Sequence, residues 1–586
     1  MPARSLRFLL AALTLSAAMA SRASADWPPF GQAIVTDGGA QVHSSIASDG
    51  ADGAIVVWQN QPIDPVNVFA QHVRADGSVD PAWPRNGRGL LGDVGAIEKQ
   101  AGGQALPVVV SDGAHGAIVV WEDLRDAATD FDLYAQHVRA DGTLDPAWPA
   151  NGVALTLAPG NQENPILVPD GAGGAIVAWT DQRSGAGALD LFAQHVLATG
   201  LVDPAWPANG LAVSAGPGRE EFPTIVSDGA GGAILAWDDN RAGAVGFDVF
   251  AEHVLASGVL DRAWPAGGRA LCTITGDQGR ATISSDGAQG AIVAWTDGRV
   301  LGTDHIFAEH VLATGNLDAN WPLNGRQVSN AGVLESRALA VSDGAGGVIV
   351  NWMAFTVHLN MFAQHVKANG ALDSNWPAAG RALSNVQRQE TGAEIVPDAA
   401  GGAVVAWADS EDIVAQHVLA SGALDPSYPD SFRAVCNLPS EQGDLALVAT
   451  SGGGAIASWT DGRNTNLDSN LDIFAMQVLL AATVDVTPVA PPTIALAPAA
   501  PNPARAGLGL TLRFTLAHPA RTSLALYDAQ GRRVRRLLAA DARSAGEQSV
   551  TWDGRDDGGN QVRAGIYFAR LEADGRVAAV KLSTLR

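Results

Sequence analysis

The sequence predicts an all-β fold: an eight-bladed β-propeller closed by strand exchange between its ends, followed by a small Ig-like β-sandwich. Three observations lead to this prediction. Tryptophan recurs regularly through most of the 586 residues, the array begins and ends with complementary half-repeats, and the composition changes near residue 481. A fixed period indicates a repeat architecture, so it bears on every later inference.

Tryptophan falls into two interleaved series, one ending apolar runs such as residues 174–179 and one standing in Trp-Pro pairs. The first series is Trp58, Trp121, Trp179, Trp237, Trp295, Trp352, Trp407 and Trp459, at spacings of 52 to 63 residues. The second series is Trp83, Trp148, Trp206, Trp264, Trp321 and Trp376, with Tyr428 in the seventh place. Each complete repeat unit therefore carries one aromatic residue of each series.

The third repeat illustrates the secondary structure expected of each unit. Residues 165–169, 175–179, 191–198 and 211–214 are short runs rich in apolar and β-branched residues, which favour strands over helices. The segment 170–174 (Asp-Gly-Ala-Gly-Gly) supplies the positive φ angles of a tight hairpin. Four antiparallel strands repeated radially form a propeller blade.

The two ends of the array complete one another. Trp27 belongs to the second half of a repeat that has no first half, whereas the repeat around Trp459 has only a first half. A ring needs this arrangement and a linear array does not. We therefore expect residues 32–36 to pair with the strand at 471–479, which removes the exposed edge of an open array.

The chain divides into four expected segments: a signal peptide at 1–25, the eight-bladed propeller at 26–480, a Pro/Ala-rich linker at 481–500 and an Ig-like C-terminal domain at 501–586. Arg4 and Arg7 precede an apolar stretch and an Ala-Ser-Ala cleavage site, the pattern of a secretory signal. We therefore expect an exported protein, extracellular or at the cell surface. No later stretch is long and apolar enough to span a bilayer.

Charge is unevenly distributed. Residues 26–489 hold 20 Lys/Arg and 53 Asp/Glu, a net charge of −33, whereas residues 490–586 hold 14 and 8, a net of +6. Such an acidic surface repels phosphates, which argues against nucleic acid as a partner. Solubility outside the cell and cation binding both explain the acidic excess.

The two cysteines, Cys272 and Cys436, occupy the same place in repeats three apart. A ring holds such positions beyond the Cα separation of about 7 Å that a disulfide allows. We expect two free, largely buried thiols.

The C-terminal segment resembles the Ig-like domain of flagellar hook-capping proteins and the related type IX-like sorting domains of exported bacterial proteins. The resemblance is carried by residues 501–503 (Pro-Asn-Pro), 526–528 (Leu-Tyr-Asp), 552–557 (Trp-Asp-Gly-Arg-Asp-Asp), 565–568 (Gly-Ile-Tyr-Phe) and 581–582 (Lys-Leu). It implies a role in secretion or surface attachment, with a plain spacer as the alternative. The propeller repeats resemble those of uncharacterised exported bacterial proteins, a likeness that implies no known activity.

Seven histidines share one repeat position: His72, His137, His195, His253, His310, His365 and His417. A metal would need several imidazole nitrogens within about 2 Å of one ion. Equivalent positions on different blades lie too far apart for that, so we assign no metal ligands. We expect structural hydrogen bonds between blades instead.

Two further repeated motifs contain acidic residues. An Asp-x-Arg follows the second strand at Asp123/Arg125, Asp181/Arg183, Asp239/Arg241, Asp297/Arg299 and Asp461/Arg463. It predicts a loop-fixing salt bridge, the alternative being an arginine cluster for carboxylates or sulfated sugars as in sialidases.

An aspartate follows the third-strand turn at Asp80, Asp145, Asp203, Asp261, Asp318, Asp373 and Asp425. These residues suit turn caps or Ca²⁺ ligands, so Ca²⁺ stays a candidate cofactor.

Ligand sites in a ring are expected where the repeat is broken. Blades 1, 6 and 7 lack the Asp-x-Arg motif. Unrepeated residues in blade 6 and at the starts of first strands are the binding candidates: Glu220, Glu221, Glu335, Arg337, Phe355 and His358. Tyr134 and Tyr428 both stand at repeated aromatic positions, so neither suits a sialidase-type nucleophile, and no catalytic residue is assigned.

We therefore expect an exported, non-enzymatic binding or structural protein whose extracellular ligand is a glycan or a protein. The C-terminal domain is expected to engage a secretion or attachment machinery. The alternative is a glycan-processing enzyme, sialidase-like or another glycoside hydrolase. It would need an unrepeated pair of carboxylates at the channel mouth.

Overall fold

The computed structural model describes most of the chain between residues 27 and 585. The described residues are 27–28, 30–36, 39–61, 67–90, 103–125, 130–185, 187–241, 246–330, 334–384, 389–410, 412–428, 432–438, 440, 442–463, 471–478, 494–496, 504–505, 510–516, 520–528, 532–544, 546–573 and 576–585. Two compact units comprise Met1–Leu480 and Ala481–Arg586. All regular structure within these ranges is β-strand. Within them, no helix is long and apolar enough to cross a membrane.

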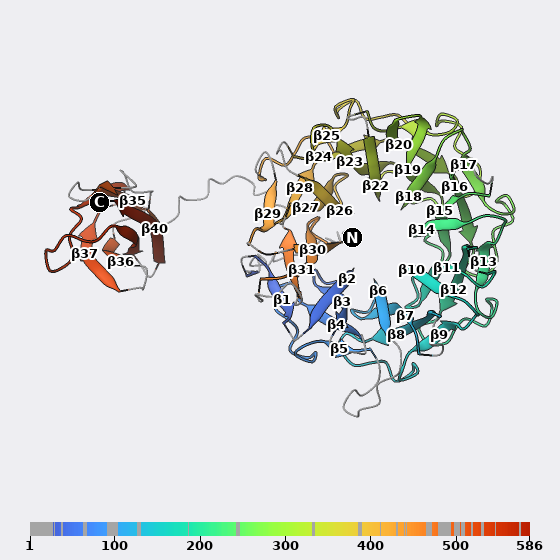
Figure 1. Ribbon diagram of the computed structural model, residues 1–586, viewed down its shortest axis with the longest axis horizontal. Helices are drawn as coiled ribbons and strands as arrows, with labels where there is room; N and C mark the ends of the chain where they lie inside the picture. The colour runs from blue at the N-terminus through green and yellow to red at the C-terminus, as the bar shows by residue number, and fades with distance from the viewer. Residues whose placement is uncertain are drawn as a thin grey trace, which may run out of the picture. The chain divides into compact units, whose positions relative to one another are not determined.

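The N-terminal unit is a propeller-like ring of four-stranded antiparallel sheets, numbered here from 1 to 8 along the chain (Figure 1). Sheet 1 contains β2 (Ala40–Ser48), β3 (Ala54–Gln61), β4 (Asn67–Val73) and β5 (Arg88–Gly89); sheet 2 contains β6 (Gln104–Ser111), β7 (Ala117–Asp123), β8 (Asp132–Val138) and β9 (Val153–Thr156); sheet 3 contains β10 (Gln162–Pro169), β11 (Ala175–Asp181), β12 (Asp190–Val196) and β13 (Leu211–Ser214); sheet 4 contains β14 (Glu220–Ser227), β15 (Ala233–Asp239), β16 (Asp248–Val254) and β17 (Arg269–Cys272).

The second half of the ring follows the same plan. Sheet 5 contains β18 (Gln278–Ser285), β19 (Ala291–Val300), β20 (Thr303–Val311) and β21 (Arg326–Gln327); sheet 6 contains β22 (Leu334–Ser342), β23 (Val348–Phe355), β24 (Leu359–Val366) and β25 (Arg381–Ala382); sheet 7 contains β26 (Glu390–Pro397), β27 (Ala403–Asp409), β28 (Asp412–Val418) and β29 (Arg433–Cys436); sheet 8 contains β30 (Gln442–Ala449), β31 (Ala455–Asp461), β32 (Asp472–Val478) and β1 (Gln32–Val35). One bridge, Asp304 to Leu334, also joins sheets 5 and 6. The first strand of each sheet faces the central opening (Figure 1).

Strand exchange between the two ends closes the ring. β1 pairs antiparallel with β32, with Gln32 opposite Ala475 and Ala33 opposite Phe474. The expected pairing of residues 32–36 with the strand at 471–479 is therefore confirmed. The indole of Trp27 donates to the Ala75 carbonyl at 3.3 Å, so residues before β1 also bind sheet 1.

The apolar core of the ring lies between neighbouring sheets. The eight tryptophans at the ends of second strands are fully buried. In the described residues, each of eight apolar clusters is shared by two consecutive sheets. The last of them joins Ile34, Ile456 and Ile473 of sheet 8 to Val56 and Trp58 of sheet 1.

Repeated glycines allow the Trp-Pro tryptophans to pack closely on the next sheet. Gly142 has a φ of +76°, and a Cβ there would lie 2.6 Å from Cγ of Trp83 in the preceding sheet. The Trp83 indole donates to the Ala140 carbonyl in the same turn at 3.1 Å. Only glycine combines this backbone conformation with this contact.

The observed strands differ from the expected ones mainly at their ends. β13 has the expected bounds, whereas β10 begins three residues earlier and β12 ends two residues earlier than expected. The residues that lengthen β10 at its start, Gln162 and Glu163, are polar, so their pairing is set by the neighbouring strand rather than by apolar patterning.

The described residues of the C-terminal unit form two sheets. One has the order β33 (Ile494–Leu496), β35 (Leu510–Leu516), β38 (Gly546–Trp552), and the other β34 (Ala504–Arg505), β40 (Arg576–Leu585), β39 (Gly565–Ala573), β36 (Ala520–Asp528), β37 (Arg533–Arg543). Leu512, Phe514, Leu524, Trp552 and Leu571 belong to its core.

Candidate functional site

Seven histidines of the ring each lie between two aspartates of their own sheet. In sheet 3, His195 Nε2 lies 3.0 Å from Asp170 Oδ2, and Nδ1 lies 2.9 Å from Asp203 Oδ2. Six further triads share this geometry: Asp49–His72–Asp80, Asp112–His137–Asp145, Asp228–His253–Asp261, Asp286–His310–Asp318, Asp343–His365–Asp373 and Asp398–His417–Asp425. The expectation that these bonds join neighbouring blades was wrong, because both turns that supply the aspartates belong to the histidine's own sheet.

The triad around His310 favours charge on both partners. Burial opposes charge on His310, but its bonds to Asp286 and Asp318 outweigh burial and raise its pKa above the ordinary 6.5. Burial likewise opposes charge on Asp286, yet His310 and the backbone N–H groups of Ala288 and Gly290 lower its pKa below 3.8. Both ring nitrogens are engaged, so these histidines stabilise the sheets.

The aspartates after the third-strand turn also cap that turn. Asp203 Oδ1 accepts the backbone N–H of Ala205 at 2.9 Å. The same bond recurs at Asp80, Asp145, Asp261, Asp318, Asp373 and Asp425. The expected turn caps are confirmed.

The Asp-x-Arg motif forms a local stack. Arg183 Nη2 lies 2.6 Å from Asp181 Oδ2, and the indole of Trp179 donates to the same oxygen at 2.8 Å. The guanidinium lies 3.7 Å from the centre of the Phe192 ring. Equivalent ion pairs join Asp123/Arg125, Asp239/Arg241, Asp297/Arg299 and Asp461/Arg463. The expected loop-fixing salt bridge is confirmed, and these arginines are engaged within their own sheets.

The free cysteines are both buried, as expected. Burial raises the pKa of each thiol to about 11, so neither is a reactive thiolate at neutral pH.

The first strand of every sheet contains a bulge, and the side chain at this bulge differs from sheet to sheet. The pairing register shifts near the start of the strand, and one residue there has a positive φ between 45° and 60°. The residues at this position, here called the bulge ring, are His43, Leu106, Asn164, Phe222, Arg280, Arg337, Gly392 and Asp444. A bulge redirects a side chain and is often found beside functional sites. All eight positions share one backbone conformation but carry varied side chains.

Neighbouring sheets hold the bulges in place. The backbone N–H of Asn164 donates to Glu122 of sheet 2 at 2.7 Å, and that of Arg280 donates to Asp238 of sheet 4 at 2.7 Å. Burial raises the pKa of both carboxyl groups to about 7. At Asn164 and Arg280, the neighbouring sheet therefore fixes the backbone of the bulge.

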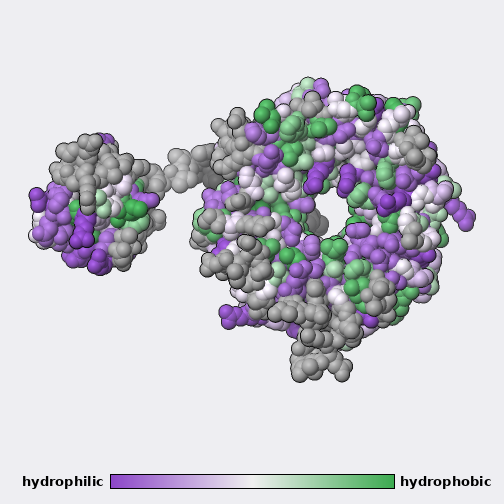
Figure 2. All heavy atoms as spheres, in the orientation of Figure 1, coloured by the Kyte–Doolittle hydropathy of each residue, from purple (hydrophilic) through white to green (hydrophobic). Residues whose placement is uncertain are grey.

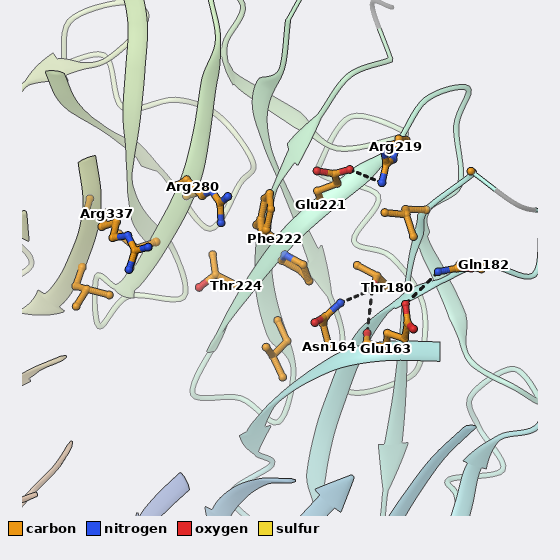
Figure 3. Close-up of a pocket in the computed structure, with 18 residues that line it drawn as sticks. Glu163, Asn164, Thr180, Gln182, Arg219, Glu221, Phe222, Thr224, Arg280 and Arg337 are labelled. Atoms are coloured by element: carbon orange, nitrogen blue, oxygen red, sulfur yellow. Dashed lines mark hydrogen bonds and ion pairs between the residues drawn. The ribbon is translucent and has the colours of Figure 1, made fainter. Parts of the chain in front are cut away.

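One pocket of about 910 Å³ opens on half of the bulge ring. Its walls come from β10, β14, β18 and β22, and it includes Asn164, Phe222, Arg280 and Arg337 (Figure 3). Hydrophilic residues border part of the central opening in the view of Figure 2. The pocket is thus a concave site at one mouth of the channel, within the size range of ligand pockets.

The two sides of the pocket differ in charge. On one side, Arg219 pairs with Glu221 at 2.8 Å, and Gln182 donates to Glu163 at 3.0 Å. On the other side, the guanidinium of Arg280 lies 3.6 Å from the centre of the Phe222 ring. Arg337 lies on the adjacent strand beyond Arg280 (Figure 3).

Neither Arg280 nor Arg337 forms an ion pair with another described side chain. These two arginines are also exposed at the pocket surface. They give this side of the pocket two cations that a ligand can reach.

The structure separates the six residues that the sequence selected. Glu221 and Arg337 line the pocket. Glu220 is 1% exposed and accepts a bond from Ser214, and its burial raises its pKa to about 7. Glu335 is 0% exposed and lies 2.7 Å from Nδ1 of His305. Glu220 and Glu335, which the sequence selected as binding candidates, are therefore not presented to a ligand, because the position two residues before the bulge residue faces into the sheet packing.

Phe355 and His358 lie on the hairpin between β23 and β24, outside the pocket lining. Sequence reasoning missed Asn164, Phe222 and Arg280. Each stands two residues after a buried Gln or Glu that opens the first strand, so an alignment of the repeats on that residue would have found them.

Comparison with known proteins finds one family match and several distantly similar solved structures. Residues 504–576 match the FlgD Ig-like domain. No curated protein matches the sequence. Similar solved structures include an α-L-arabinanase of Penicillium chrysogenum, with 9% identity over 77% of this chain and 100% of the other and a TM-score of 0.32. They also include an ulvan lyase (10%, 70% and 97%, TM-score 0.38) and prolyl oligopeptidase B of Galerina marginata (10%, 74% and 56%, TM-score 0.39). Likenesses this distant carry no inference about ligand or activity.

Proposed function

We propose that the protein is an exported, non-enzymatic binding protein, extracellular or at the cell surface. In this proposal an eight-bladed propeller presents the ligand site, and the Ig-like C-terminal domain sorts or attaches the protein. The eight apolar clusters and the β1–β32 pairing support the blade number. The match to the FlgD Ig-like domain supports the identity of the C-terminal domain.

The bulge ring is the observation that carries the binding proposal. The backbone conformation is repeated around the opening, while the side chains differ from sheet to sheet. A rigid frame with variable side chains suits recognition, because the side chains are positioned before the ligand arrives.

The engaged carboxylates support binding over catalysis. Glu221 is paired with Arg219, and Glu163 accepts bonds from Gln182 and Asn161. The two carboxylates nonetheless line one pocket, which is the observation that favours the alternative, a glycan-processing enzyme.

An array of neutral and acidic glycans, with a parallel array of extracellular proteins, tests this proposal. The mature chain, residues 26–586, is applied with and without Ca²⁺, and both retention and glycan cleavage are measured. Retention without cleavage is expected, and a loss of retention without Ca²⁺ would support the cation role of the acidic surface. Glycan cleavage would overturn the non-enzymatic proposal. The absence of retention on both arrays would overturn the proposed binding function.

Cell fractionation tests the attachment role of the C-terminal domain. A native exporting host expresses the full chain or a chain ending at residue 480. We expect surface retention of the full chain and release of the shorter chain. Equal release of the two chains would contradict an attachment role and would support a spacer role for the C-terminal domain.

A further inference from the structure

We propose that the pocket binds a short acidic oligosaccharide, with a sugar carboxylate or sulfate held by Arg280 and Arg337. This proposal rests on the proposed binding function and names its ligand class. Four features of the pocket carry it: two exposed cations, a pre-placed aromatic ring, hydrogen-bonding groups on the opposite wall, and the charge of the surrounding unit.

The two cations come from adjacent first strands. Arg280 and Arg337 occupy equivalent bulge positions on β18 and β22, and both line the pocket. Planar guanidinium groups bind carboxylate and sulfate oxygens through paired N–H donors. Two neighbouring guanidinium groups therefore define an anion site at this side of the pocket.

Arg280 is positioned by Phe222. Its guanidinium stacks 3.6 Å from the ring centre, and its own backbone N–H is held by Asp238. Stacking restricts the side chain before the ligand binds, which lowers the entropy cost of binding. The Phe222 side chain is 45% exposed, so part of its apolar surface stays available to a sugar ring.

The opposite wall suits sugar hydroxyl groups. Glu163 and Glu221 present carboxylate acceptors, and Asn164 and Gln182 present amides, all within the same pocket. Glu221 is neutralised by Arg219, and Glu163 accepts a bond from the Gln182 amide. Both carboxylates therefore suit sugar hydroxyl donors better than a metal ion or a further cation. An acidic sugar carries an anion and several hydroxyl donors on one ring, whereas an acidic peptide lacks the hydroxyl groups.

The charge of the surrounding chain limits the ligand's length. Residues 26–489 have a net charge of −33, so a densely charged polymer is repelled outside the pocket. A short or sparsely charged oligosaccharide places its anion on the arginines without that repulsion.

Isothermal titration of the mature chain, residues 26–586, tests the ligand class. The probes are trigalacturonate for carboxylate, a κ-carrageenan tetrasaccharide for sulfate, neutral maltotriose and the peptide triglutamate. We expect one or both acidic sugars to bind at one site per chain, more weakly at high salt, and the better of the two identifies the anion. Preference for maltotriose or triglutamate would overturn this ligand class while leaving a binding function intact.

Variants at the arginines test the site. Arg280→Gln and Arg337→Gln should each weaken binding of the acidic sugar by about tenfold to a hundredfold. Arg262→Gln is the matched control, because Arg262 is an exposed arginine of sheet 4 outside the pocket lining. It should change affinity by less than about twofold. Melting curves confirm that each variant is folded.

The outcomes separate this proposal from the proposed function. Acidic-sugar binding that both pocket variants leave unchanged would overturn the site. Retention of neutral glycans or proteins alone on the arrays would overturn the ligand class but not the binding function. Silence in the titrations and on the arrays would overturn both.

Discussion

Individual side chains of the ring act in charged groups rather than alone. Each triad histidine bridges a hairpin turn and a third-strand turn, so one imidazole stabilises two turns. Sheet 8 shows what happens when the histidine is absent: Gln477 and Thr450 stand where other sheets have His and Asp. An aspartate at position 450 would lack the charge partner that the histidine supplies in the other sheets.

Replacing one triad histidine should destabilise the ring. His310→Gln removes the cation between Asp286 and Asp318, and we expect the free energy of unfolding to fall by about 1–3 kcal/mol. Thermal and urea melting of the chain of residues 26–586 measure the change. His358→Gln, on the β23–β24 hairpin outside the triads, is the control. Equal melting of His310→Gln and the unaltered protein would contradict a stabilising role.

Stability should depend on pH with an optimum on the acid side of neutrality. The pKa values of Asp49, Asp112, Asp286 and Asp398 are lowered, so their contribution is complete above 3.8 and is lost as pH falls through the folded values. The pKa values of His72, His137, His310 and His417 are raised. The contribution of these histidines to stability is therefore complete below pH 6.5 and is lost as pH rises through the folded pKa values.

Buried carboxylic acids move this optimum further toward acid. Burial raises the pKa of Glu122, Glu252 and Glu309 to about 7, so these groups reduce stability as pH rises from 4.5 to 7. We therefore expect the highest Tm between about pH 4 and pH 6, with a decline on both sides. A melting series from pH 3 to pH 9 measures it. A Tm that rises steadily to pH 8 would contradict this account.

At the scale of the strand and turn, the same local devices recur from sheet to sheet. A glycine turn packs on the Trp-Pro tryptophan of the preceding sheet, and a bulge aims one side chain of each first strand. The first device fixes how neighbouring sheets pack. The second leaves a position at which the sequence can vary without changing the frame.

A pair of glycine variants separates packing from backbone strain. Gly142→Ala and Gly113→Ala place alanine at φ angles of +76° and +74°, but only the first Cβ meets another side chain, Cγ of Trp83 at 2.6 Å. We expect backbone strain to lower the free energy of unfolding of both variants by about 1 kcal/mol. The contact with Trp83 should lower that of Gly142→Ala by about 1–3 kcal/mol more. Melting of both variants measures the difference. Equal losses would mean that the turn moves away from Trp83 at no cost.

At the scale of the N-terminal unit, closure depends on a strand from the other end of the array. β1 completes sheet 8, and Trp27 binds sheet 1. The apolar cluster of Ile34, Trp58 and Ile456 would be opened if this segment left.

Removing residues 26–40 should therefore destabilise sheet 8 and expose the edge of β32. We expect a lower Tm, faster amide exchange in β32, and aggregation at lower protein concentration. Hydrogen exchange read out by mass spectrometry, together with thermal melting, measures this. A truncated chain that melts like the chain of residues 26–586 would contradict closure as a source of stability.

The sequence by itself determined the repeat period, the four-stranded unit, the half-repeats that close the ring, the turn caps and the Asp-x-Arg salt bridges. These features depend on local patterning or on residues a few positions apart, so one chain suffices to recognise them. Only the tertiary structure decided which residues reach the pocket. The bulge breaks the two-residue alternation of a strand, so Glu220 is buried while Phe222, two positions later, faces the opening. Likewise, Arg280 and Arg337 are 57 residues apart in sequence, and only the packing of adjacent sheets brings them into one site.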